Sequence, residues 1–284
     1  MTLLVAAAAG FLAGRLVWVS LASTFSSPVF GRTNHRGVVV PTAAGIAVPV
    51  ALLLVEAGRV VAGAAGWGEE GLTGARAVTV LAALGFGLLG AFDDLASAGG
   101  DARGFRGHVA SMMRGRLTTG GLKLVGGACV SLLACAAVSG GATIGALVRD
   151  AALVALAANL GNLFDRAPGR TLKVGAFAFL LVAVFASHRT PLVAPAVVVG
   201  AALALLRDDL HERLMLGDAG ANVLGGVVGL AVVLSAAPSV RTVVLIVVAA
   251  LNLLSELVSF SAVIDRIGPL RALDRAGRRP RHPL

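Results

Sequence analysis

The chain has 284 residues, of which 57% are hydrophobic and only 14% are charged, and its mean hydropathy is +0.89. A soluble domain usually carries about 25% charged residues, so this composition excludes an ordinary soluble protein. The net charge of +9 comes almost entirely from arginine, and no basic stripe is interleaved with aromatic residues, which argues against a nucleic-acid partner.

Apolar stretches of about 20 residues recur along the chain, each long enough to cross roughly 30 Å of hydrocarbon. They lack the alternating polarity typical of the strands of outer-membrane barrels. The sequence therefore predicts an all-α, polytopic transmembrane helical bundle in which residues 1–284 form a single integral membrane domain. We expect about nine spans, near residues 2–21, 40–64, 76–92, 121–139, 143–164, 172–188, 190–206, 221–237 and 241–264.

Basic residues gather in every second connection and in the tail. The basic segments are 23–39, 93–120, 165–173, 207–220 and the stretch after 264, whereas the other connections are short or poor in bases. By the positive-inside rule, the N-terminus lies outside and the C-terminus lies in the cytoplasm, which agrees with an odd number of spans. Residues 265–284 are then a basic cytoplasmic tail of a multi-pass membrane protein.

Two adjacent carboxylates, Asp93 and Asp94, stand where the third apolar run ends. A carboxylate pair at the lip of a membrane helix is costly unless something cationic binds there. Two such groups can share a Mg²⁺ ion, or one can hold the metal while the other acts as a base. The alternative is a solvated helix end.

Asn159, Asn162 and Asp165 recur at intervals of three near the end of the fifth apolar run. This spacing predicts that they lie along one face of a helix, where two amides and a carboxylate inside a membrane need a polar partner. The alternative is hydrogen bonding between helices, which is common for asparagine in membranes. Because Asp165 lies at the water boundary, we favour a site.

Asp218 precedes a glycine-containing turn into the eighth run. It can cap that helix, or the turn can offer backbone N–H groups to a phosphate. Beside the other acidic motifs, which share the cytoplasmic side of the predicted topology, we favour metal ligation. The combination predicts one cytoplasm-facing site in which carboxylates hold Mg²⁺ and the metal and nearby bases neutralise a di- or polyphosphate. The candidate phosphate contacts are Arg103, Arg106, Arg114, Arg116 and Lys123.

The aspartate pair at a helix end, the NxxNxxD helix and the GDxG turn, in this order, resemble the polyprenyl-phosphate phosphoglycosyl transferase family (MraY/WecA-like) over roughly residues 30–265. The resemblance implies transfer of a sugar-1-phosphate from a UDP-sugar to undecaprenyl phosphate, with Mg²⁺ and release of UMP. That reaction serves cell-envelope polysaccharide or peptidoglycan precursor synthesis at the bacterial plasma membrane. By motif, Asp93, Asp94 and Asp165 are catalytic, Asp218 binds the metal, and Asn159 and Asn162 lie on the nucleotide side.

Several family features are missing. No lysine follows the aspartate pair by three residues, Arg166 and Pro168 replace a glycine and an aspartate of the family pattern, and the late histidine-rich loop is absent. These departures motivate an alternative, a catalytically impaired homologue that binds a lipid-linked precursor or a partner protein. A second alternative is an intramembrane prenyltransferase, for which Asp209 with Glu212 supplies only a poor second acidic cluster. The oligomeric state stays open, with a homodimer among the arrangements considered.

Overall fold

The computed structural model describes residues 1–34, 36–69, 71–96, 118–138 and 143–279. These residues are almost entirely helical, with one short antiparallel pair of strands, β1 (Gly31–Thr33) and β2 (Val39–Pro41). Eight helical stretches are long and apolar enough to cross a membrane, which confirms the prediction of an all-α, multi-pass membrane protein. They are α1 (Leu3–Phe25), η2 with α2 (Ala44–Ile46, Ala47–Ala64), α3 (Gly74–Ala96), α5 (Thr119–Val138), α6 (Ile144–Phe164), η3 with α8 and α9 (Thr190–Leu192, Val193–Leu203, Leu206–Leu210), α10 (Asp218–Ser235) and α11 (Pro238–Leu257).

The remaining expected span, near 172–188, corresponds to α7 (Arg170–Phe185). Its 16 residues cover roughly 24 Å at about 1.5 Å per residue, which is less than the hydrocarbon thickness. It nevertheless packs within the bundle against α6, α8 and α10. A count of nine spans therefore stays a prediction, because eight stretches of the described chain have the required length.

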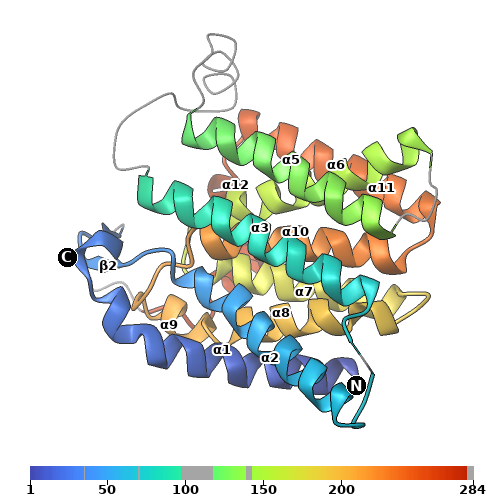
Figure 1. The fold of residues 1–284 in the computed structure, drawn as a ribbon. Coiled ribbons are helices and arrows are strands. Elements are labelled where there is room, and N and C mark those ends of the chain that lie inside the picture. The colour runs from blue at the N-terminus through green and yellow to red at the C-terminus, as the bar shows by residue number, and fades with distance from the viewer. Residues whose placement is uncertain (35, 70, 97–117, 139–142, 280–284) are drawn as a thin grey trace.

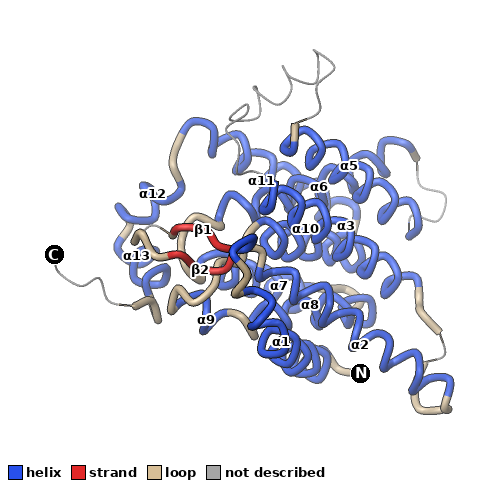
Figure 2. Tube along the Cα trace, turned by 60° about the vertical axis from the view of Figure 1, so that its left-hand side comes forward, coloured by secondary structure: helices blue, strands red, loops and turns tan. Residues whose placement is uncertain are grey.

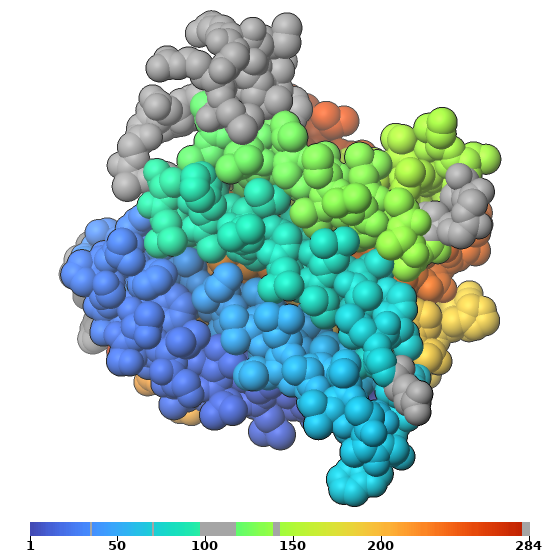
Figure 3. Space-filling view, in the orientation of Figure 1, coloured from blue at the N-terminus to red at the C-terminus, as the bar shows by residue number. Residues whose placement is uncertain are grey.

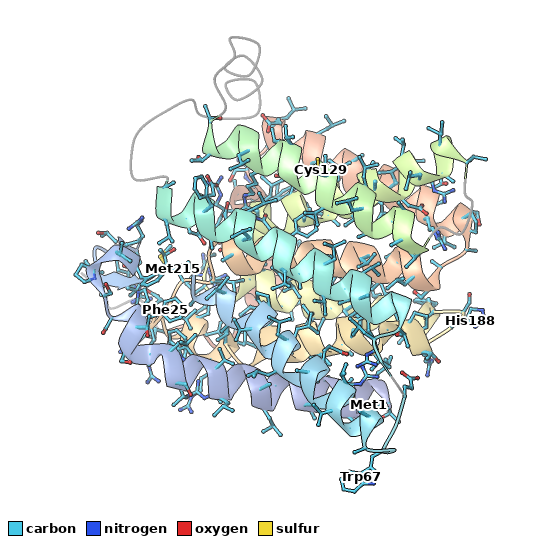
Figure 4. All side chains as sticks on the ribbon, viewed as in Figure 1. Met1, Phe25, Trp67, Cys129, His188 and Met215 are labelled. Carbon is cyan, nitrogen blue, oxygen red and sulfur yellow. The ribbon has the colours of Figure 1, made fainter. Side chains whose placement is uncertain are left out.

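Successive helices run in alternating directions, so the connections fall at two ends of the bundle (Figure 1). Phe25 and Met215 lie at one end, whereas Met1, Trp67 and His188 lie at the other (Figure 4). The first end also holds the hairpin β1–β2 and the two short C-terminal helices, α12 (Phe260–Arg266) and α13 (Gly268–Arg275) (Figure 2). We call it the acidic end, because Asp93, Asp94, Asp165 and Asp218 all lie there.

Helix α10 lies at the centre of the bundle, and helix α11 lies at its periphery. In the apolar window of α10, 83% of the residues are buried, against 6% in that of α11. α10 packs on α3 and α6, while α3 and α5 lie side by side on the face shown in Figure 3. Because α10 packs on α3 and α6, its N-terminal residue Asp218 lies at the acidic end between these helices.

Small residues let helices α1 and α8 approach closely. A Cβ atom added at Gly10 would overlap the backbone of Val197, and one added at Gly200 would overlap the backbone of Ala7. Lipid is as apolar as a helix surface, so membrane helices associate through this kind of close packing. The contact ties the first membrane helix to the middle of the chain.

Replacing Gly200 with alanine is expected to destabilise the protein by about 1–3 kcal/mol, because the new methyl group has no room. The matched control is Gly58→Ala in α2, where nothing lies within 4 Å of an added Cβ. Alanine has a better helix propensity than glycine by about 1 kcal/mol, so the control is expected to be neutral or stabilising. Thermal unfolding in detergent measures both, and equal melting temperatures would contradict the close approach.

Candidate functional site

The N-terminus of α10 is capped by a carboxylate from another helix. The N–H groups of Asp218 and Ala219 donate to Oδ1 and Oδ2 of Asp94 on α3, each at 3.0 Å. The preceding residue, Gly217, has φ +69°, and a Cβ there would overlap the Asp94 carboxylate. The sequence suggested that the backbone N–H groups of this turn could bind a phosphate. In the structure, the N–H groups of Asp218 and Ala219 donate to Asp94 instead. The favourable position of a negative charge at a helix N-terminus explains the arrangement.

Beside this cap, Lys123 of α5 joins the two remaining acids. Its Nζ pairs with Oδ2 of Asp218 and lies 4.0 Å from Oδ2 of Asp93. Asn162 of α6 completes the group: its amide nitrogen donates to Oδ1 of Asp218 at 2.6 Å and its amide oxygen accepts from Lys123 Nζ at 2.6 Å. We call Asp93, Asp94, Lys123, Asn162 and Asp218 the lip cluster. Four different helices supply it.

The lip cluster carries three carboxylates against one ammonium group. The side chains of Asp93, Lys123 and Asp218 are each about four-fifths buried, so the excess negative charge favours a bound cation. Within the described residues no three histidine, cysteine, aspartate or glutamate side chains could hold a metal ion together. Mg²⁺ usually needs only one or two carboxylates, with substrate phosphates and water completing the shell. The pair Asp93 and Asp218 therefore fits a Mg²⁺ ion that shares a substrate phosphate, and does not fit a metal held by protein alone.

Asp165 follows the last residue of α6 and lines a cavity of about 150 Å³ next to the lip cluster. Burial raises the pKa of Asp165 well above its usual 3.8, and the carboxylates of Asp209, Asp218 and Asp94 raise it further. A carboxyl group in these surroundings holds a proton more tightly than a solvated one, which suits an acid–base role.

The same cavity is lined by acids that the sequence did not mark as site residues. Asp209 accepts a hydrogen bond from the N–H of Gly169 at 2.8 Å. Glu212 accepts from Asn34 Nδ2 at 3.1 Å and pairs with Arg36 at 2.9 Å. In the sequence, Asp209 and Glu212 were only a weak argument for a prenyltransferase. Their position beside Asp165 depends on the packing of α9 against the loop after α6, which no local motif encodes.

The three members of the NxxNxxD motif lie in three different environments. Asn159 Nδ2 donates to Oδ1 of Asn252 on α11 at 2.7 Å, and Asn252 donates to the Leu156 carbonyl at 3.1 Å. Asn162 instead joins the lip cluster, and Asp165 lines the cavity. An interval of three residues turns the side chain by about 60° around a helix, so six residues separate the faces by about 120°. Asn159 therefore makes the interhelical hydrogen bond that was its alternative interpretation.

Four of the predicted phosphate contacts lie outside the described residues: Arg103, Arg106, Arg114 and Arg116. Another arginine, Arg32 of β1, closes the end of α3. Its Nη2 donates to the carbonyl oxygens of Asp94 at 3.0 Å and Leu95 at 3.3 Å. A basic group at a helix C-terminus is favourable, and here it fixes the turn that carries the aspartate pair.

The end of β2 and the residues that follow it pack against the turn that precedes Asp218. The N–H of Met215 donates to the Pro41 carbonyl at 2.7 Å, and the N–H of Gly45 donates to the Leu216 carbonyl at 2.9 Å. A Cβ at Gly45 would overlap the backbone of Gly220. These contacts hold the turn before α10 against the start of α2. No protein-family model and no curated protein sequence matches the chain.

Proposed function

We propose that this protein transfers a sugar-1-phosphate from a UDP-sugar to a polyprenyl phosphate, such as undecaprenyl phosphate, at the cytoplasmic face of the bacterial plasma membrane. The observation that carries the proposal is the lip cluster. Four membrane-length helices bring three carboxylates, a lysine and an amide together at one end of the bundle. A lipid phosphate can reach such a lip from the bilayer, and a nucleotide can reach it from water.

The positive-inside rule supports the orientation that this proposal needs. The described arginines Arg32, Arg166, Arg213 and Arg275 belong to connections at the acidic end. Cytoplasmic connections of membrane proteins are enriched in such residues. The acidic end then faces the cytoplasm, where UDP-sugars are made, and the N-terminus lies on the other side.

The proposed reaction is an in-line phosphoryl transfer. An oxygen of the lipid phosphate attacks the phosphorus that bears the sugar, the bond from that phosphorus to the bridging oxygen breaks, and UMP leaves with the bridging oxygen. Asp93 orients the attacking phosphate and takes its proton. Lys123 moves from the carboxylates to the diphosphate oxygens, where a positive charge stabilises the developing negative charge.

Asp94 has a different role from Asp93 in this mechanism. Both of its carboxylate oxygens accept hydrogen bonds from α10, so it is a positioning residue that holds Asp218 in place. Asp218 would hold Mg²⁺, which supplies charge neutralisation of the diphosphate when it is bound, and the neighbouring Asp93 stays available as the proton acceptor. In this proposal the nucleotide part of the UDP-sugar binds in the cavity that Asp165 lines.

The proposed roles of the two neighbouring aspartates are separable by mutation. Asp93→Asn is expected to lower transfer by about 10²-fold with only a small change in melting temperature, because it removes a proton acceptor while Asp94 still accepts the two hydrogen bonds from the α10 backbone. Asp94→Asn is expected to lower both activity and stability, with about 1 kcal/mol lost from the helix cap. Transfer assays and thermal unfolding of both variants give the comparison. Identical effects of the two substitutions on stability would refute the division of roles.

Transfer of radiolabelled sugar-phosphate from UDP-N-acetylglucosamine to undecaprenyl phosphate in membranes tests the function itself. We expect a lipid-linked, Mg²⁺-dependent product and release of UMP. If several UDP-sugars give no product while the purified protein still binds polyprenyl phosphate, the protein is a binding homologue without transferase activity. Product formed from a prenyl diphosphate instead would indicate the prenyltransferase alternative.

A further inference from the structure

The two C-terminal helices α12 and α13 are firmly attached to the acidic end of the bundle (Figure 2). Arg170, at the start of α7, donates from Nε and Nη2 to the two oxygens of Asp274 at 2.8 and 3.1 Å, and both side chains are buried. Lys173 Nζ donates to three carbonyl oxygens at the end of α13. Phe260 stacks on Phe164 with ring centroids 5.0 Å apart. This segment is therefore part of the folded bundle.

Although it is fixed, α13 and the residue before it expose large apolar side chains. Leu273 is 69% exposed, and Ile267 and Leu270 are also exposed. Leu257, the last residue of α11, is also 83% exposed. We call Ile267, Leu270 and Leu273 the apolar strip, and exposed large apolar side chains grouped in this way mark a contact with another apolar phase.

The same helices present positive charge beside that strip. Arg266, Arg271 and Arg275 are exposed, and the acidic residues of the segment offset them only in part. Asp274 faces inward to Arg170, and Asp265 pairs with Arg275 at 2.7 Å. Along α13, Leu270 and Leu273 are three residues apart while Arg271 and Arg275 are four apart, so each pair occupies one side of the helix.

The position of α12 and α13 next to the end of α11 indicates that the membrane covers their exposed apolar side chains. α12 begins three residues after the end of α11, a membrane-length helix that packs on α6 and has only 6% of its apolar window buried, so that its outer side faces lipid. The strip thus starts at the edge of the hydrocarbon. Helices with leucines on one side and arginines on the other lie in the plane of the membrane interface, where anionic headgroups attract the basic side.

We propose that α12 and α13 form an interfacial anchor that binds anionic phospholipid. Leu270 and Leu273 insert below the headgroups, and Arg271 and Arg275 contact the headgroup phosphates. The inference is independent of the proposed transferase function, because it uses no residue of the lip cluster. Through the Arg170–Asp274 pair, the anchored segment also holds the loop that contains Asp165.

The depth of Leu273 tests the insertion. A spin label is placed at Leu273→Cys in a Cys129→Ala, Cys135→Ala background, with the full chain reconstituted in vesicles of phosphatidylcholine and phosphatidylglycerol. Trp67→Cys, in an exposed loop at the opposite end, is the reference in water, and Leu253→Cys on α11 is the reference in lipid. We expect the Leu273 label to be several-fold more accessible to oxygen, relative to a water-soluble nickel complex, than the Trp67 label. Equal accessibility of the two labels would overturn the proposal and leave the strip facing water or a soluble partner.

The arginines test the preference for anionic lipid. Phosphatidylglycerol is titrated into detergent-solubilised protein, and its affinity is read from the rise in melting temperature. A basic side chain near an anionic surface contributes about fivefold in affinity, so Arg271→Gln with Arg275→Gln is expected to weaken the apparent affinity by roughly 25-fold. The matched control is Arg189→Gln, an exposed arginine at the opposite end. An unchanged affinity in the double variant, or an equal loss in the control, would contradict lipid binding by α13.

Discussion

Asp218→Asn is expected to lower sugar-phosphate transfer by about two to three orders of magnitude, comparable with the removal of one strong electrostatic contact from an active site. Asp218 is the point where the helices of the lip cluster meet: Lys123 and Asn162 contact its carboxylate, and its backbone N–H donates to Asp94. The substitution keeps the size of the side chain and the backbone cap. It removes the charge that would hold Mg²⁺ and position Lys123.

The control for this loss is Asp265→Asn, which removes an exposed carboxylate from the same end of the bundle. Its transfer rate is expected to equal that of the wild type. The melting temperature of Asp218→Asn is expected to change little, since Lys123 keeps a carboxylate, Asp93, at 4.0 Å. Transfer by Asp218→Asn within a factor of about two of the wild type would remove Asp218 from the mechanism.

The main features of the fold were predictable from the sequence, because a membrane-spanning helix must satisfy its backbone hydrogen bonds internally and be apolar over its whole length. The all-α architecture and the position of most helices follow from that constraint. The exception is α7, whose 16 residues end sooner than the apolar run suggested. The gathering of Asp93, Asp94, Asp165 and Asp218 at one end follows from the alternation of helix direction.

The contacts within the site were not predictable in the same way. Asp94 caps a helix that begins 124 residues later, and Arg32 closes the end of α3 from 62 residues earlier. Long-range partners of this kind have no local signal in one sequence. The position of Lys123 is a related case, because a lysine was expected just behind the aspartate pair. A lysine from α5 instead reaches Asp218, so the cluster contains a lysine despite its absence after Asp94.

The largest loss of stability is expected from Asp274→Ala, which leaves the buried Arg170 guanidinium without its carboxylate. Breaking a buried ion pair from one side costs about 3–5 kcal/mol. The control is Asp265→Ala, which breaks the exposed pair with Arg275 and is expected to cost at most about 1 kcal/mol. Thermal unfolding in detergent compares the two. A double variant, Arg170→Met with Asp274→Leu, is expected to recover only part of the loss, because it removes these two charges together but leaves Arg278, which also pairs with Asp274 at 2.6 Å, without that carboxylate.

The same pair predicts a dependence of stability on pH. Burial alone would raise the pKa of Asp274, but Arg170 and Arg278 lower it by more, so it lies below its usual 3.8 in the folded protein. A carboxyl group with a lowered pKa stabilises the fold fully above its unfolded pKa, and the stabilisation is lost as the pH falls through the folded pKa. The wild type is therefore expected to lose stability below about pH 4 more steeply than Asp274→Asn, which has no proton to bind at this position. If the acid unfolding curves of the two proteins were parallel, the Asp274 carboxylate would not be the source of this dependence of stability on pH. Since Arg170 begins the helix that follows the Asp165 loop, a weakened pair would also loosen the cavity side of the site.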